Sequence, residues 1–199
     1  MSLERESTAV LDTLPRGPGM TITRARDAHP HTGRKQRDAG EPGFELHPAV
    51  ARGMQQMRES GDVGGATAVT LFSSPTMHVS YVWFKSGYPL PIHSHDVDCF
   101  YQIFAGSMRV GNEVLEKGDG VMIPAGVPYT VTPGDAGVEF FEFRTGVDYD
   151  THYRARTDSY WDRVNETRME RKAIWAAEKA PYGLLDWTAT PARLSASDR

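Results

Sequence analysis

Two histidines and a cysteine are the residues whose types and spacing could hold a metal ion. They lie in PIHSHDVDCFYQIFAG, residues 91–106, where His93 and His95 are one residue apart and Cys99 is the only cysteine of the chain. On an extended segment, the side chains of residues i and i+2 point to the same side. A pair of neutral imidazoles facing the inside of a barrel can bind a first-row divalent cation when further ligands complete its shell. The spacing therefore predicts a candidate metal site.

The elements that must position this site read as short β-strands. Segments rich in β-branched and aromatic residues are separated by Gly, Pro, Asn and Asp, which is typical of strands joined by tight turns. The segments are 66–72, 77–84, 99–106, 107–111, 113–116, 120–126, 129–132 and 138–143. Many short strands at close spacing predict a small antiparallel barrel or sandwich, rather than strands that alternate with helices.

The flanks of this β-rich region differ from it in composition. Residues 1–43 are rich in Pro, Gly, Arg and Asp and are expected to form a flexible arm. Pro48 stands at a plausible first helical turn, so residues 48–60 are predicted to form one helix. A second helix is predicted over 158–180, packed against the barrel or a second subunit through Trp161, Ile174 and Trp175. The expected units are the arm, a helical segment, a barrel, and a C-terminal helix with its tail: 1–43, 44–65, 66–146 and 147–199.

Two stretches resemble the signature motifs of the cupin family. They are GYPLPIHSHDVDCFYQIFAG and GDGVMIPAGVPYTVTP. The positions that keep the family's spacing are Gly87, His93, His95 and Gly106 in the first stretch, and Gly118, Pro124 and Gly126 in the second. The resemblance covers roughly residues 66–145 and implies an all-β fold, a small antiparallel β-barrel (the double-stranded β-helix of cupins). It also implies bound metal and chemistry inside the mouth of the barrel.

The same register shows where this chain departs from the family. The usual glutamate ligand falls on Cys99, the third histidine on Tyr129, and the asparagine position on Pro133. In one interpretation His93, His95 and the Cys99 thiolate hold the metal, with Tyr129 as a weak ligand or hydrogen-bond donor. A thiolate with two imidazoles favours zinc or copper.

Two further interpretations stay open. The two histidines could combine with a carboxylate to hold iron, and the candidate carboxylates are Asp96, Asp98, Glu139 and Glu142. Alternation argues against Asp98 if Cys99 faces inward. Alternatively, the metal site has been lost and the barrel binds an organic molecule through His93, His95, Tyr101, Gln102 and Tyr129.

The function expected from these residues is that of a metal-dependent cupin-type enzyme acting on a small aromatic or apolar substrate. Tyr129 and Cys99 are the predicted catalytic residues, and Tyr101, Gln102 and His78 are predicted to contact substrate. The reaction is not resolved among dioxygenase, isomerase, lyase and cyclase, with oxidoreductase the expected class. The cofactor would be one divalent transition metal, zinc, iron or copper. The alternative is a non-catalytic binding or sensing module with a degenerate metal site.

Composition limits the partners. The chain has 199 residues and a formal net charge of −4, so no basic field points to nucleic acid or an anionic membrane. No apolar run approaches the ~20 residues that span a bilayer. A single cysteine suits a reducing compartment, and a cytoplasmic location is expected. Edge strands of a barrel need covering, and together with the family resemblance this predicts a homodimer.

Overall fold

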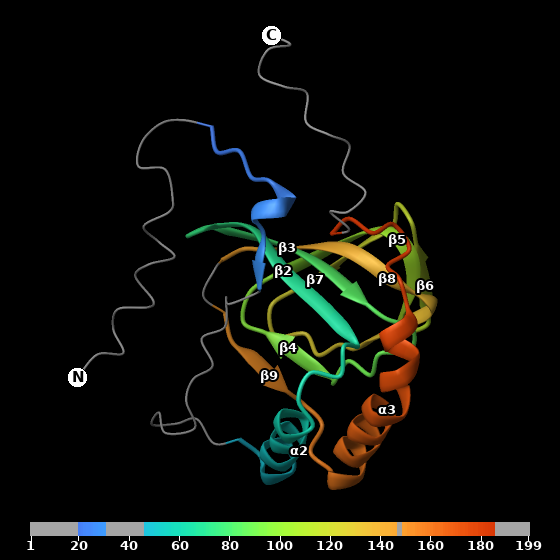
Figure 1. Cartoon of the computed structure of the whole chain (residues 1–199). Coiled ribbons are helices and arrows are strands. Elements are labelled where there is room, and N and C mark those ends of the chain that lie inside the picture. The colour runs from blue at the N-terminus through green and yellow to red at the C-terminus, as the bar shows by residue number, and fades with distance from the viewer. Residues whose placement is uncertain (1–19, 31–45, 147–148, 186–199) are drawn as a thin grey trace, which may run out of the picture.

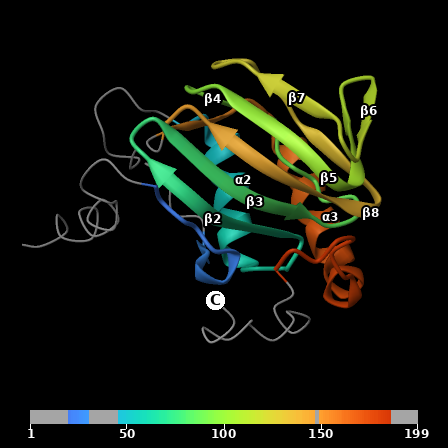
Figure 2. The ribbon, with the colours of Figure 1, turned by 90° about the horizontal axis from the view of Figure 1, so that it is seen from above.

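The computed structural model describes residues 20–30, 46–146 and 149–185. Its strands are β1 (His29–Pro30), β2 (Ala66–Ser74), β3 (Met77–Phe84), β4 (His93–His95), β5 (Cys99–Val110), β6 (Glu113–Glu116), β7 (Gly120–Ile123), β8 (Val131–Arg144) and β9 (Thr151–Tyr153). The helices are the 3-10 turn η1 (Ala25–Asp27), α2 (Pro48–Glu59) and α3 (Asp158–Ala177). Figures 1 and 2 show the strands curling into a barrel, with α2 and α3 beside each other at its flank.

The barrel is built from antiparallel strands. A seven-stranded sheet has the order β1-β2-β3-β8-β5-β6, and β7 pairs with β5. The small sheet β4-β9 is joined to it at Tyr129, whose backbone exchanges two hydrogen bonds with that of His93, at 2.8 and 3.0 Å. The predicted fold class, a small antiparallel β-barrel with flanking helices, is confirmed.

The inward faces of β3, β8 and β5 form cross-strand rows, because directly paired residues share a face of the sheet. Arg144 is paired with His78 on one side and Cys99 on the other, and Glu142 is paired with Ser80 and Tyr101. We call the six residues of these two rows the polar end of the barrel. The next rows are apolar and include Val82, Ile103, Phe140 and Val138. The barrel therefore has a hydrocarbon-filled half and a polar half.

The glycines of the two motif stretches have a conformational reason. Gly87, Gly106, Gly118 and Gly126 all adopt positive φ, between 56° and 99°. A Cβ on Gly106 would also meet the carbonyl oxygen of Gly137 at 2.1 Å. Only glycine tolerates both the left-handed backbone and so close an approach of the neighbouring strand.

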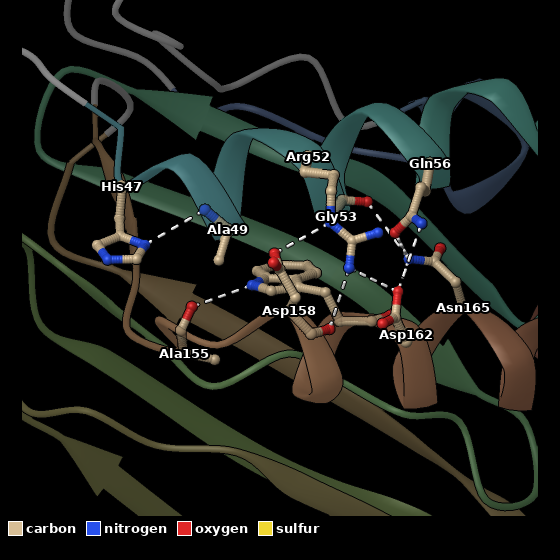
Figure 3. A network of polar contacts seen from close by, with 10 residues as sticks. His47, Ala49, Arg52, Gly53, Gln56, Ala155, Asp158, Asp162 and Asn165 are labelled. Atoms are coloured by element: carbon tan, nitrogen blue, oxygen red, sulfur yellow. Dashed lines mark hydrogen bonds and ion pairs between the residues drawn. The ribbon is translucent and has the colours of Figure 1, made fainter.

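The two helices pack on each other through a buried tryptophan. Trp161 is fully buried, and a Cβ on Gly53 would meet its ring at 2.2 Å. Arg52 on α2 bridges Asp158 and Asp162 on α3, at 3.0 and 2.7 Å (Figure 3). This helix pair closes one side of the barrel.

Helix α3 buries four side chains along one face. Trp161, Val164, Arg168 and Trp175 are buried at helical spacing, whereas Ile174 is 52% exposed. Ile174 does not pack against the barrel, because it falls off this face, and its predicted packing against a second subunit stays a prediction. The Trp175 ring is anchored by a hydrogen bond from its Nε1 to the Ser86 carbonyl, at 2.9 Å.

Several strand boundaries differ from those predicted. Segments 99–106 and 107–111 form the single strand β5, and segments 129–132 and 138–143 lie on or beside the single strand β8. Local irregularities in the β5–β8 pairing, at 103–105 and 106–108, let these long strands bend instead of ending. The strand pair β1–β2 was not predicted, since β1 has only two residues. Within the described ranges, no helix is both long and apolar enough to cross a bilayer.

Candidate metal centre

Strand β4 directs both histidines into the barrel. His93 and His95 are buried, with 6% and 5% of their surface exposed, and their ring centroids are 4.9 Å apart. Ser94 between them points the other way, where its hydroxyl accepts hydrogen bonds from the Arg154 guanidinium at 2.7 and 3.1 Å. The predicted convergence of the two imidazoles is present.

Backbone carbonyls orient both rings in the same manner. Nδ1 of His93 lies 2.7 Å from the Pro91 carbonyl oxygen, and Nδ1 of His95 lies 3.1 Å from that of Asp150. A carbonyl can only accept, so each Nδ1 carries the proton and each Nε2 carries the lone pair. Histidines that bind metals are typically held by such a hydrogen bond from the second ring nitrogen.

Two further ligand-type side chains lie beside His95. Cys99 at the start of β5 and Glu142 near the end of β8 are both buried, and together with His95 they offer ligand atoms within 4.8 Å of one another. Alternation along β8 decides which glutamate enters the barrel. Glu142 is on the inner face, whereas Glu139 faces the C-terminal segment and accepts hydrogen bonds from Tyr81 and from the Gly183 amide.

The carboxylate at this site is paired with a buried arginine. Nη2 of Arg144 lies 2.6 Å from Oε1 of Glu142, with only 6–7% of each side chain exposed. Burial alone would lower the pKa of Arg144, but the Glu142 carboxylate raises it overall, so the guanidinium remains charged. The guanidinium carbon also lies 4.1 Å from the centroid of the Tyr149 ring.

Cys99 is a protonated thiol at neutral pH when no ion is bound. Burial raises its pKa to about 11, and the nearby Arg144 charge opposes this rise only in part. A buried thiol of this kind is a poor nucleophile, because the thiolate is the reactive form. Binding a divalent ion would release the proton, as metal–thiolate ligation requires.

Two tyrosine hydroxyls form a hydrogen-bonded chain that begins at His93. The Tyr129 hydroxyl lies 3.0 Å from Nε2 of His93 and 2.5 Å from the Tyr101 hydroxyl. Because His93 Nε2 carries the lone pair, Tyr129 donates to it. Burial raises the pKa of both tyrosines well above the usual value, so both are proton donors at neutral pH.

The structure separates the predicted substrate-contact residues. Tyr101 and His78 lie at the polar end, where His78 is 1% exposed with its Nε2 2.9 Å from the Ser80 hydroxyl. Burial lowers the pKa of His78 to about 4, so it is neutral at pH 7. Gln102 is on the opposite face of β5, where its amide donates to the carbonyls of Gly118 and Asp119. Gln102 does not face the inside of the barrel, because side chains alternate along a strand and its neighbour Tyr101 faces inward.

The remaining carboxylates considered as ligands are used elsewhere. Asp96 accepts a hydrogen bond from the Asp150 amide, at 2.7 Å, and Asp98 accepts one from the Ala125 amide, at 2.8 Å. Both act in holding loops. Sequence reasoning missed Arg144, although the spacing Glu142-x-Arg144 on one strand was a signal that the two side chains share a face.

The donor set fits a divalent transition metal. His93 and His95 offer oriented imidazole nitrogens, and Cys99 and Glu142 offer a sulfur and a carboxylate nearby. Zinc accepts all three donor types in four-coordinate sites, and iron and copper accept subsets of them. His95, Cys99 and Glu142 would hold the ion, with Glu142 shared between it and Arg144. His93 lies outside this group of mutually close ligand atoms, although its ring centroid is 4.9 Å from that of His95.

Comparison with known proteins finds similar solved structures but no similar sequences. No protein-family model matches the sequence, and no curated protein is similar enough in sequence to count as a relative. Similar solved structures include an RmlC-like cupin from Shewanella frigidimarina, with 20% identity, 42% of this chain and 78% of the other covered, and TM-score 0.40. Another is the polyketide cyclase RemF from Streptomyces resistomycificus (14% identity, 52% and 83% covered, TM-score 0.45).

A third is salicylate 1,2-dioxygenase from Pseudoaminobacter salicylatoxidans, crystallised with gentisate (17% identity, 54% and 34% covered, TM-score 0.41). This chain therefore matches about a third of the dioxygenase. These likenesses concern the course of the backbone. The barrel topology and the positive-φ glycines are consistent with the cupin resemblance of the two motif stretches.

Proposed function

We propose that this chain is a metal-dependent enzyme of the cupin type, acting on a small aromatic or apolar organic substrate at the polar end of its barrel. The metal would be held by His93 and His95 with Cys99 and Glu142. A divalent ion bound there supplies a Lewis acid that polarises an oxygen of the substrate.

The observation that carries this proposal is the shared orientation of the two imidazoles. Both Nδ1 atoms are engaged by backbone carbonyls, at 2.7 and 3.1 Å, so each Nε2 carries a lone pair. That of His93 accepts a hydrogen bond from the Tyr129 hydroxyl at 3.0 Å, which an ion bound there would replace. A histidine with a purely structural role does not need a backbone carbonyl to fix its proton on Nδ1 and leave Nε2 unprotonated. Two adjacent rings prepared alike, next to Cys99 and Glu142, favour a shared ion.

The chain's own residues supply proton transfer and exclude water. Tyr129 is the proposed proton shuttle, because its hydroxyl links His93 to Tyr101 in a buried hydrogen-bonded chain. Its raised pKa makes it a donor, not a phenolate base, at neutral pH. The apolar rows behind the polar end include Val82, Ile103 and Phe140, and they would shield the reacting atoms from water.

Cys99 is assigned the role of ligand. With a pKa near 11 it is not a nucleophile at neutral pH unless a cation stabilises the thiolate. A thiolate ligand favours zinc or copper, whereas two histidines and a carboxylate suit iron. An oxidoreductase, our expected class, requires one of the redox-active metals.

A second candidate function is a binding module that uses no metal. The observation in its favour is the Glu142–Arg144 ion pair, which engages a carboxylate that the ion would need. In that case the inside of the barrel would bind an organic ligand through the hydroxyls of Tyr101 and Tyr129 and the imidazoles of His93 and His95.

Metal analysis of the purified full-length chain distinguishes the two functions. We expect about one divalent ion per chain in the wild type, and none in the double variant His93→Ala/His95→Ala. His152→Ala is the matched control, since this histidine is Ser94's partner on β9 and lies outside the cluster. It should retain the ion. Retention of a stoichiometric ion by the double variant would refute the proposed site, and a metal-free wild type that binds ligand would support the binding module.

A further inference from the structure

Arg144 has more hydrogen-bonding capacity than its surroundings use. It is 7% exposed, and its Nη2 donates to Glu142 at 2.6 Å. Nε and Nη1 are also buried, and no hydrogen-bond partner for either is present in the described part of the chain. Buried donors are almost always satisfied in folded proteins, so two unsatisfied donors on one charged side chain call for an explanation.

A purely structural role leaves these donors unexplained. Neutralising Glu142 takes one nitrogen of the guanidinium, and stacking on Tyr149 takes the face of the group. Neither contact uses Nε or Nη1, and the Cys99 sulfur beside the guanidinium is only a weak acceptor. Stability alone is also a weak explanation for this buried ion pair, because a protein in which hydrophobic residues of similar volume replace such a pair is often as stable.

The position of Arg144 connects it to the proposed metal site. It is paired across the sheet with Cys99 and is two residues from Glu142, two of the proposed ligands. His78, on its other side, is neutral at pH 7 and adds no charge. Arg144 is thus the one cationic side chain of the polar end as we have defined it.

Charge balance then favours an anionic occupant. In the ion-bound state, the Cys99 thiolate and the Glu142 carboxylate offset the two positive charges of a divalent ion. The charge of Arg144 remains, and an uncompensated charge in a buried site is costly. A ligand with a single negative charge would neutralise it and accept the unused hydrogen bonds.

We propose that Arg144 binds the carboxylate of the substrate through one of its two unused donors, Nε or Nη1, which makes the substrate a small carboxylic acid with an aromatic or apolar body. This inference rests on the proposed function. A carboxylate accepts charge-assisted hydrogen bonds from guanidinium, and its single charge matches the deficit. The aromatic or apolar body of the substrate would contact the buried rings of Tyr101, Tyr129 and Tyr149.

The test compares benzoate with benzamide, its neutral analogue of the same shape, by calorimetric titration of the metal-loaded full-length protein. Phenylacetate, hexanoate and inorganic phosphate complete the panel. We expect at least one carboxylate to bind, with benzoate about tenfold or more tighter than benzamide, as a charged hydrogen bond would give. Arg144→Lys should remove this preference, whereas Arg109→Lys, a change at an exposed arginine on β5, should preserve it.

A second measurement does not depend on a folded variant. A guanidinium proton of Arg144, on Nε or on Nη1, should shift in the NMR spectrum of the wild type when the carboxylate binds, and stay in place with benzamide. The inference is overturned if no carboxylate binds, if benzamide binds as tightly as benzoate, or if phosphate is preferred over every carboxylate. Metal content measured on the same samples separates the two claims: loaded protein without carboxylate preference rejects this inference alone, and protein that takes up no metal rejects the proposed function.

Discussion

The buried ion pair between Glu142 and Arg144 makes a quantitative prediction about stability. Their nitrogen and oxygen atoms are 2.6 Å apart, and each side chain is 6–7% exposed. Glu142→Gln keeps the shape of the side chain but leaves the guanidinium without its counter-charge. Removing one partner of a buried pair typically costs about 3–5 kcal/mol, because the remaining charge stays desolvated. We therefore expect the free energy of unfolding to fall by about that amount.

The assay is denaturant unfolding at neutral pH with a chelator present, so that metal binding does not contribute to the measured free energy. A double-mutant cycle with Arg144→Met isolates the interaction. The combined variant should lose about 1–3 kcal/mol less than the sum of the single losses.

The matched control is Arg52→Met, which removes a pair of similar length on the surface. Arg52 and Asp162 are 2.7 Å apart, but their side chains are 40% and 44% exposed. Water screens such a pair, so we expect only a small loss. If Glu142→Gln costs no more than this control, the reasoning that the barrel desolvates the pair is refuted.

Three other measurements follow from the structure. His78 has its pKa lowered from 6.5 to about 4 by burial, so the unfolded chain binds a proton in this window and the folded chain does not. The free energy of unfolding should accordingly fall by about 2–3 kcal/mol as the pH drops from 6.5 to 4. His78→Gln should flatten this dependence of the unfolding free energy on pH. An unchanged slope in the variant would contradict the claim that buried His78 causes it. Gly53→Ala should lower the melting temperature, because the added methyl group meets the Trp161 ring. Overpacking of this kind costs about 1–3 kcal/mol, against about 1 kcal/mol gained from the better helix propensity of alanine. A higher melting temperature would show that the Trp161 ring moves to make room. Phe100 and Met122 face each other on β5 and β7 and are 36% and 52% exposed, so the predicted homodimer would bury them; light scattering should show a dimer that Phe100→Ser weakens, and a wild-type monomer at micromolar concentration would reject the dimer.

Much of the fold was predictable because it depends on local pattern. Runs of β-branched and aromatic residues bounded by Gly, Pro, Asn and Asp placed the strands, and the spacing of the motif glycines placed turns where the structure has positive φ. The histidine pair was predictable for the same reason, since an i, i+2 spacing on any strand brings two side chains to one face. Helix α2 was predicted to within one residue of its end at Glu59.

What could not be predicted depends on pairing between distant strands. Arg144 is brought beside Cys99 only by the β5–β8 register, which relates residues 45 positions apart. The same register places Glu142 beside Tyr101 in the polar end, whereas alternation along β8 turns Glu139 to the other face. Gln102 was expected in the site because its type suits binding, but its neighbour Tyr101 takes the inward position.

The most direct test of the account is anomalous diffraction from a crystal of the metal-loaded protein, collected at the absorption edge of the metal found by elemental analysis. We predict one strong peak between the Nε2 atoms of His93 and His95, with Cys99 or Glu142 completing its shell. An ion bound elsewhere, with both imidazoles left in their hydrogen bonds and no peak between them, would contradict the central claim.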